Sequence, residues 1–161
     1  MKKKLFIISN ESIKFKDNKF YCDNIDLKST PEGLNKKFEV QLFGRKSYID
    51  RSHEIKIKKI KIFSNIFSYL LSVIKASREE NTKFFIISIS PYTFILSLCL
   101  RMFGKKPILY LRSDGYKEYR AILGKLGPII YHIMFSITCL ISDLISCRNF
   151  ILKGKKGKIL K

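Results

Sequence analysis

The stretch KFFIISISPYTFILSLCLRMFGKKPILYLRSDG, residues 83–115, decides the predicted fold. It opens with an apolar run, continues with an apolar helical pattern after Pro91, and ends with a second apolar run before the turn residues Asp-Gly. Two buried strands joined by a crossover helix form a βαβ unit, and such units build parallel sheets covered on both faces. Ligands of open parallel sheets bind beyond the carboxyl ends of the strands, so we expect the functional site at residues 88–93 and 112–116.

The segments before this unit extend the α/β pattern. We predict a first strand at 3–9, a long polar loop at 10–37 with a small hairpin around 15–22, and a strand at 38–43 that Gly44 stops. The repeat IKIKKIKI at 55–62 alternates apolar and basic residues, which predicts an edge strand with one face in water. The next segment, 63–78, has the apolar spacing of an amphipathic helix.

The segments after the unit alternate in the same way. A helix is expected after Gly115, with one apolar side formed by Tyr119, Ile122, Leu123 and Leu126. Gly127-Pro128 breaks it, and a second helix is predicted up to about Leu140. A short strand at 142–147, a basic connection at 149–156 and the start of a further strand at 158–161 follow. We expect this last strand to continue into a linker and another domain.

Composition points to an anionic partner. The chain of 161 residues, enough for one domain with a core, has a net charge of +19, mostly from Lys. Such a charge favours a membrane surface, a nucleic acid or a polyanionic substrate, although an AT-rich genome also produces Lys-rich chains. A basic block is either a lipid-facing or a plain solvated surface; it comprises Arg45, Lys46, Arg51, His53, Lys56, Lys58, Lys59 and Lys61. It lacks the aromatic side chains that stack on single-stranded nucleic acids, and no nucleic-acid partner is expected.

The cysteines, the histidines and the apolar runs indicate an intracellular protein without a His-based metal site or membrane spans. The four cysteines form no C-x-x-C pair and mostly sit in apolar runs, which predicts buried free thiols in a reducing cytoplasm. With only two histidines, a His-based metal site is not expected. The apolar run after the basic start is too short for a signal peptide. The longer runs 86–103 and 127–147 are interrupted where a βαβ pattern expects interruption, so we do not predict membrane spans.

Candidate site residues follow from position, because no P-loop, dinucleotide fingerprint, nucleophile elbow or zinc-protease motif occurs. Asp114 follows the second buried strand, where a carboxylate acts as a general base on a hydroxyl; the same residue is also expected simply to cap the next helix. Ser90, Tyr92, Arg112 and Tyr116 are candidate acceptor contacts, with a solvated helix end as the alternative for Tyr116.

The order of these elements resembles the N-terminal domain of GT-B glycosyltransferases of the family 4 type. The resemblance covers residues 3–161 and rests on the first strand, IISIS with Pro-Tyr-Thr, KPILYLRSDGY, and SDLISCRNFIL, which is similar to the family's S/A-D-x-I-I-x-x-S strand. It implies one half of a GT-B fold, a three-layer Rossmann-like domain that binds a glycan or lipid-linked acceptor. Asp114 takes the place of the family's acceptor-facing His or Asp.

The resemblance also implies what the chain lacks. The donor-binding domain with its Glu-x7-Glu motif is absent, so we expect a C-terminal donor domain or partner chain, a nucleotide-sugar as donor substrate, and no other cofactor. The Gly-Gly loop after the first strand is replaced by Asn10-Glu11-Ser12. The implied setting is polysaccharide or lipopolysaccharide biosynthesis at the cytoplasmic face of an anionic membrane.

Three other classes remain open. A flavodoxin-like or receiver-like module would dock to membrane or protein without catalysis, although Glu11 alone poorly matches the acidic cluster of receivers. A basic α/β protein that binds nucleic acid would show steeply salt-dependent binding to any duplex. An integral membrane protein would stay in the membrane pellet after a high-salt or carbonate wash.

Overall fold

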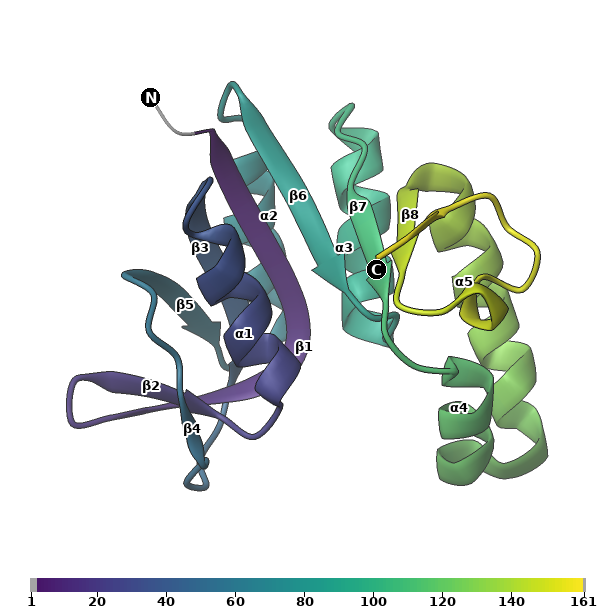
Figure 1. The fold of residues 1–161 in the computed structure, drawn as a ribbon, viewed down its shortest axis with the longest axis horizontal. Coiled ribbons are helices and arrows are strands. Elements are labelled where there is room, and N and C mark those ends of the chain that lie inside the picture. Colours follow the sequence, from purple (N-terminus) through teal and green to yellow (C-terminus); the bar gives the residue numbers. More distant parts are fainter. Residues whose placement is uncertain (1–2, 161) are drawn as a thin grey trace. The chain divides into compact units, whose positions relative to one another are not determined.

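The computed structural model describes residues 3–160 and shows an α/β protein whose strands pair mostly in parallel (Figure 1). The predicted α/β class is therefore confirmed. The chain divides into two compact units, and the boundary falls inside strand β6, with unit 1 ending at Phe84 and unit 2 starting at Phe85. Each unit has its own strands and helices.

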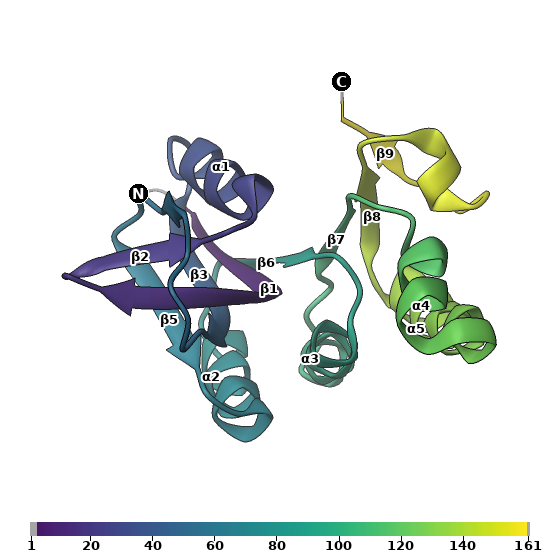
Figure 2. The same cartoon turned by 90° about the horizontal axis from the view of Figure 1, so that it is seen from below.

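Unit 1 combines a parallel sheet with an antiparallel extension. Its elements are β1 (Lys4–Lys16), β2 (Lys19–Cys22), α1 (Ile25–Leu34), β3 (Glu39–Lys46), β4 (His53–Glu54), β5 (Lys59–Phe63), α2 (Ile66–Ser77) and the start of β6 (Thr82–Ile87). β1 pairs in parallel with β3, and β3 with β5. The end of β1 forms an antiparallel hairpin with β2, and β2 pairs with β4. The helices α1 and α2 lie on opposite faces of these strands (Figure 2).

The polar segment 10–37 differs from its predicted long loop. The small hairpin is confirmed, but β1 continues to Lys16 and α1 occupies Ile25–Leu34. The helix begins where Asn24 caps it, with Asn24 Oδ1 accepting a hydrogen bond from the Asp26 amide at 3.0 Å. Only Leu27 and Pro31 are buried along α1, so the sequence carries too little apolar periodicity to reveal the helix.

Two strand boundaries in unit 1 also differ from the predictions. Gly44 does not stop β3, which runs on to Lys46. A Cβ at position 44 would lie 2.6 Å from Ile13 Cδ1, so glycine allows β3 to pass close to β1. Of the predicted edge strand at 55–62, only the part from Lys59 onward joins the parallel sheet, as β5. Among the described strands, β5 pairs only with β3, so it lies at an edge as predicted. Ile55 instead donates its amide to the Phe20 carbonyl at 2.8 Å.

The Tyr69 hydroxyl ties α2 to the strands of unit 1. Tyr69 is fully buried. The Tyr69 oxygen lies 2.9 Å from the Ser9 carbonyl oxygen and 2.8 Å from the Phe43 carbonyl oxygen, which share its single hydroxyl proton. The same oxygen accepts the Ser9 amide at 3.2 Å. The hydroxyl thus satisfies backbone groups of both β1 and β3, which water does not reach.

Replacing Tyr69 by Phe removes these hydrogen bonds without a large change of volume. We expect Tyr69→Phe to lower the free energy of unfolding by about 1–3 kcal/mol, because the Ser9 amide and two carbonyls lose a buried partner. Urea denaturation followed by circular dichroism measures this, with Tyr48→Phe at an exposed position as the matched control. Equal stability of the two variants would contradict the structural role of the hydroxyl.

Unit 2 is a parallel sheet with helices on one face. Its elements are the end of β6, α3 (Pro91–Met102), β7 (Ile108–Leu111), α4 (Gly115–Leu123), η1 (Gly124–Leu126), α5 (Gly127–Ile141), β8 (Asp143–Ser146), η2 (Asn149–Leu152) and β9 (Lys158–Ile159). The strands pair in parallel in the order β6-β7-β8-β9. The predicted βαβ unit is confirmed, as are the two strands that follow it. Figure 2 shows α3, α4 and α5 on the same side of β7 and β8.

The helices α4 and α5 are separate and pack side by side (Figures 1 and 2). The predicted break at Gly127-Pro128 is confirmed, and a Cβ at Gly127 would lie only 1.9 Å from the Tyr119 carbonyl oxygen. The expected apolar side of the first helix is not buried, however, because Ile122, Leu123 and Leu126 are all exposed. Apolar spacing alone did not reveal that this side faces away from the core.

Three of the four free cysteines are buried, as predicted, and Cys147 is half-buried. Burial raises the pKa of Cys22 in unit 1 to about 11, and the pKa of Cys139 in unit 2 to about 12, from an ordinary value of 9.0. Between pH 9 and pH 11 the folded chain therefore holds thiol protons that the unfolded chain has lost.

This difference predicts alkaline destabilisation. The two thiols contribute fully to the free energy of unfolding below pH 9. Their contribution falls as the pH rises toward 11, because the thiols of the unfolded chain lose their protons first. Denaturation at closely spaced pH values under reducing conditions measures the slope. The double variant Cys22→Ala/Cys139→Ala is expected to have a lower free energy of unfolding at pH 7. Between pH 9 and 10, its free energy of unfolding should fall less steeply with pH than that of the native chain. An unchanged slope in this variant would show that other groups cause it.

Candidate functional site

The carboxyl ends of three neighbouring parallel strands meet at one edge of unit 2. Ile87 pairs with Tyr110, and Leu111 pairs with Ser146, so the residues that follow β6, β7 and β8 lie next to one another. Polar side chains follow each strand at this edge. This is the place where the predicted βαβ unit led us to expect a ligand.

The first polar pair at this edge joins β6 to β7. Ser88 follows β6 with φ of +60°, a conformation that a non-glycine residue seldom adopts. Its amide donates to the Tyr110 carbonyl at 2.9 Å, and its carbonyl accepts the Thr93 hydroxyl at 3.0 Å. Arg112 Nε donates to Ser88 Oγ at 3.3 Å. The tight turn therefore places the Ser88 hydroxyl against a guanidinium group.

Ser90 and Tyr92 begin the crossover helix. Ser90 is the N-cap of α3, where its Oγ accepts the Thr93 amide at 3.2 Å and its own amide donates to Thr93 Oγ1 at 2.8 Å. This reciprocal capping box gives Ser90 a structural role that the sequence analysis did not separate from ligand contact. Tyr92 lies in the first turn of α3 and is half-buried.

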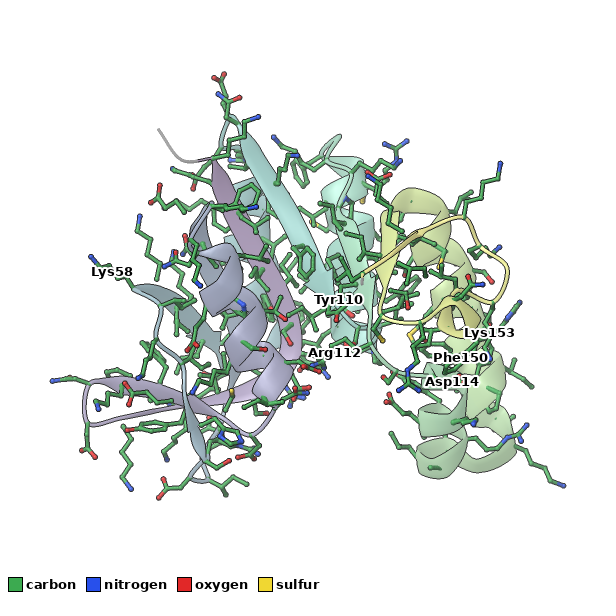
Figure 3. All side chains as sticks on the ribbon, in the orientation of Figure 1. Lys58, Tyr110, Arg112, Asp114, Phe150 and Lys153 are labelled. Carbon is green, nitrogen blue, oxygen red and sulfur yellow. The ribbon has the colours of Figure 1, made fainter. Side chains whose placement is uncertain are left out.

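Asp114 lies at the start of α4 with both carboxylate oxygens engaged. Oδ1 accepts the Tyr116 amide at 3.1 Å and so caps the helix, while Oδ2 accepts Lys153 Nζ at 3.3 Å. Figure 3 shows Asp114 and Lys153 close together, near Phe150. The Asp114 side chain is 11% exposed and that of Lys153 is 41% exposed, so the pair borders solvent on the lysine side.

Tyr116 links the start of α4 to α5. Burial of its ring raises the pKa of Tyr116, so the phenol is protonated at neutral pH. Its hydroxyl forms a hydrogen bond with His132 Nδ1 at 2.8 Å, and His132 Nε2 lies 3.4 Å from Ser136 Oγ. Lys153 Nζ lies 5.6 Å from the centre of the Tyr116 ring.

Lys153 and His132 were not predicted as site residues. They lie 39 and 16 residues away from the partners that they contact, and no local motif connects them. Folding brings Asp114, Tyr116, His132 and Lys153 into one polar cluster. Arg112 contacts Ser88, and Ser90 caps α3.

The cavity beside these groups is small. Its volume is about 10 Å³, which holds about one water molecule. It is lined by Ser88, Ile89, Leu111, Arg112, Ser113, Gly115, Glu118 and Tyr131. Gly115 is required there, since a Cβ would lie 2.1 Å from the Tyr131 ring. Among residues 3–160, no group of three or more His, Cys, Asp or Glu side chains is placed to hold a metal ion.

The basic block of unit 1 is partly paired. Arg51 donates to Asp23, and Lys59 forms an ion pair with Glu39. Lys58 is exposed and projects away from unit 1 (Figure 3). Arg51 and Lys59 thus form ion pairs on the surface of unit 1. Exposed lysines of the basic block, such as Lys58, contribute to its positive electrostatic potential.

The fold and the polar edge define an α/β protein with a candidate ligand site at the carboxyl ends of its parallel strands. Comparison of the chain with models of protein families, with curated proteins and with solved structures finds no match. The function is therefore argued from the residues and their geometry.

The two roles of Asp114 are separable by substitution. Asp114→Ala removes the helix cap and is expected to lower the free energy of unfolding by about 1 kcal/mol, whereas Asp114→Asn keeps a capping oxygen and changes it much less. Thermal unfolding of both variants beside the native chain measures the difference. If the two variants lose equal stability, the ion pair with Lys153 rather than the cap stabilises this helix start.

Proposed function

We propose that this chain is the acceptor-binding half of a GT-B-type glycosyltransferase. In the full enzyme, a sugar would pass from a nucleotide-sugar to an acceptor hydroxyl of a membrane-linked glycan or lipid. The donor would be held by a further domain or a partner chain. The order of elements that resembles family 4 enzymes and the α/β fold support this proposal, and the three-layer Rossmann-like arrangement is part of it.

The observation that carries the proposal is the position of Asp114. A carboxylate lies at the carboxyl end of a parallel strand, where open α/β sheets bind ligands. Lys153 contacts this carboxylate, and the Tyr116 hydroxyl next along the helix contacts His132. Hydroxyl-rich ligands such as sugars are bound by such sets of charged and polar side chains.

The proposed chemistry requires one exchange of partners. Asp114 Oδ1 stays on the amide of Tyr116, while Oδ2 releases Lys153 Nζ and accepts the hydroxyl of the acceptor. Asp114 then takes or orients the hydroxyl proton as the oxygen attacks the sugar carbon of the donor. The bond between that carbon and the phosphate oxygen breaks, and the nucleotide leaves with the bonding electron pair. Lys153 remains close enough to bind an anionic part of the acceptor. Arg112 beside Ser88 offers a second contact to the acceptor.

A non-catalytic docking module is the second candidate function. It is favoured by the full engagement of Asp114, since both of its oxygens already serve the fold. Under this alternative the basic chain docks to an anionic membrane or nucleic acid and transfers no sugar.

Transfer of labelled sugar to membrane lipids tests the proposal in the complete enzyme, formed by this chain with its donor domain or partner. Asp114→Asn is expected to reduce kcat by about 10²–10⁴, because the carboxylate that accepts the proton is lost. Asp143→Asn is the matched control, an exposed carboxylate paired with Lys106 at the opposite end of a strand. Unchanged turnover in Asp114→Asn would overturn the role of Asp114.

Ligand binding by the isolated chain provides a second test of the proposed function. We expect it to bind alkyl glycosides but to transfer no sugar, because the donor site is not among its residues. Saturation-transfer NMR with alkyl glycosides and with nucleotide-sugars compares the two ligand classes. Transfer by the isolated chain, or binding of nucleotide-sugars without alkyl glycosides, would contradict an acceptor-binding half.

A further inference from the structure

Helix α5 exposes apolar side chains opposite its buried side, and His132 and Ser136 are its only exposed or half-buried polar side chains. No charged residue occurs between Gly127 and Ile141. One side packs inside unit 2 with Tyr131, Met134, Phe135, Thr138 and Cys139. The other side exposes a continuous stripe at helical spacing, formed by Ile129, Ile130, Ile133, Ile137 and Leu140. A helix with an apolar outer side has a second apolar environment to contact.

The connection between the helices also exposes apolar side chains. Ile122 and Leu123 at the end of α4 and Leu126 in η1 are all exposed, Leu126 by 66%. We call these three residues and the five exposed residues of α5 the hairpin face. It lies on α4, η1 and α5, which pack against one another in unit 2 (Figure 1).

The hairpin is not built to cross a bilayer. Gly115–Ile141 is the one stretch within residues 3–160 that is long and apolar enough to be a candidate span. The chain reverses within it, however, at Gly124 with φ of +60° and at Gly127, whose close approach to Tyr119 fixes the helices together. The 9 residues of α4 and 15 of α5 span about 14 and 22 Å, short of the roughly 30 Å hydrocarbon core.

Positive charge borders the hairpin face. Lys117, Arg120 and Lys125 are exposed on α4 and η1, against a single carboxylate, Glu118. An apolar helix surface flanked by Lys and Arg is the pattern of helices that lie in the interface of anionic membranes. A second copy of this basic chain, or another basic domain, would be repelled by the same charges.

We propose that the hairpin face is a membrane-docking surface that inserts its apolar side chains into the interface of an anionic bilayer. Leu126 and Ile133 enter the boundary of the acyl chains, while Arg120 and Lys125 contact lipid phosphates. The docking does not depend on sugar transfer, because vesicle binding needs neither donor nor acceptor. If the proposed function also holds, α4 connects the docked surface directly to Asp114 and Tyr116.

Flotation with vesicles tests this surface in the full chain. Binding to phosphatidylcholine vesicles that contain phosphatidylglycerol is compared for the native chain and Leu126→Gln/Ile133→Gln. The double variant is expected to bind at least about tenfold more weakly, because two apolar side chains no longer leave water. The control Phe67→Gln/Leu71→Gln alters equally exposed apolar residues of α2 in unit 1 and is expected to bind as the native chain does.

Substitution of two basic residues in each region distinguishes docking through the hairpin face from docking through the basic block. Arg120→Gln/Lys125→Gln is expected to weaken binding to anionic vesicles by about fivefold for each charge removed, with no change on pure phosphatidylcholine. Lys56→Gln/Lys58→Gln removes two exposed charges of the basic block and serves as the control. Circular dichroism verifies that all variants fold, which is expected since every altered side chain is exposed.

Three outcomes overturn the proposal. The first is equal loss of binding in the hairpin and control variants, which would make docking a matter of overall charge. The second is a native chain that ignores vesicles and forms a dimer by light scattering, which Leu126→Gln/Ile133→Gln dissociates. The third is retention in membranes after a carbonate wash, which would indicate a span. Loss of vesicle binding with unchanged alkyl glycoside binding would leave the proposed sugar transfer intact.

Discussion

Parallel pairing of buried strands is the constraint on which the rest of this structure depends. A parallel ladder cannot be closed by a tight turn, so every pair needs a crossover, and here α3 and the α4–α5 hairpin supply it in unit 2. The same geometry aligns the carboxyl ends of β6, β7 and β8. The polar residues that follow these strands therefore meet at one edge, whatever function they serve.

The residues of the candidate site have structural roles in the fold. Asp114 caps α4 with one oxygen and holds Lys153 with the other, and Ser90 closes a capping box. Carboxylates and hydroxyls stabilise helix starts because the first amides of a helix lack intrahelical partners. Those helix starts follow parallel strands directly, so the groups that cap them also face the edge where ligands bind.

Charge and hydropathy act on different surfaces of the chain. The basic block of unit 1 includes cations that pair with Asp23 and Glu39, whereas the hairpin face of unit 2 combines exposed aliphatic side chains with bordering cations. A net charge of +19 alone favours anionic partners in general and does not single out a surface. The exposed apolar residues on the same elements as Arg120 and Lys125 are the reason for proposing the hairpin face, rather than the basic block, as the membrane-docking surface.

The sequence by itself determined the α/β class, the βαβ unit of residues 83–115, the break at Gly127 and the position of Asp114 after a strand, because strand and helix periodicities are local properties. The sequence did not predict α1, because too few of its residues are buried to give a helical pattern of apolar residues. It also did not predict that β3 continues beyond Gly44. Only the tertiary structure decided that Lys153 and His132 join Asp114 and Tyr116, and that Leu126 faces away from the core. These contacts depend on how helices pack over a sheet, and packing joins residues whose separation in the chain carries no signal.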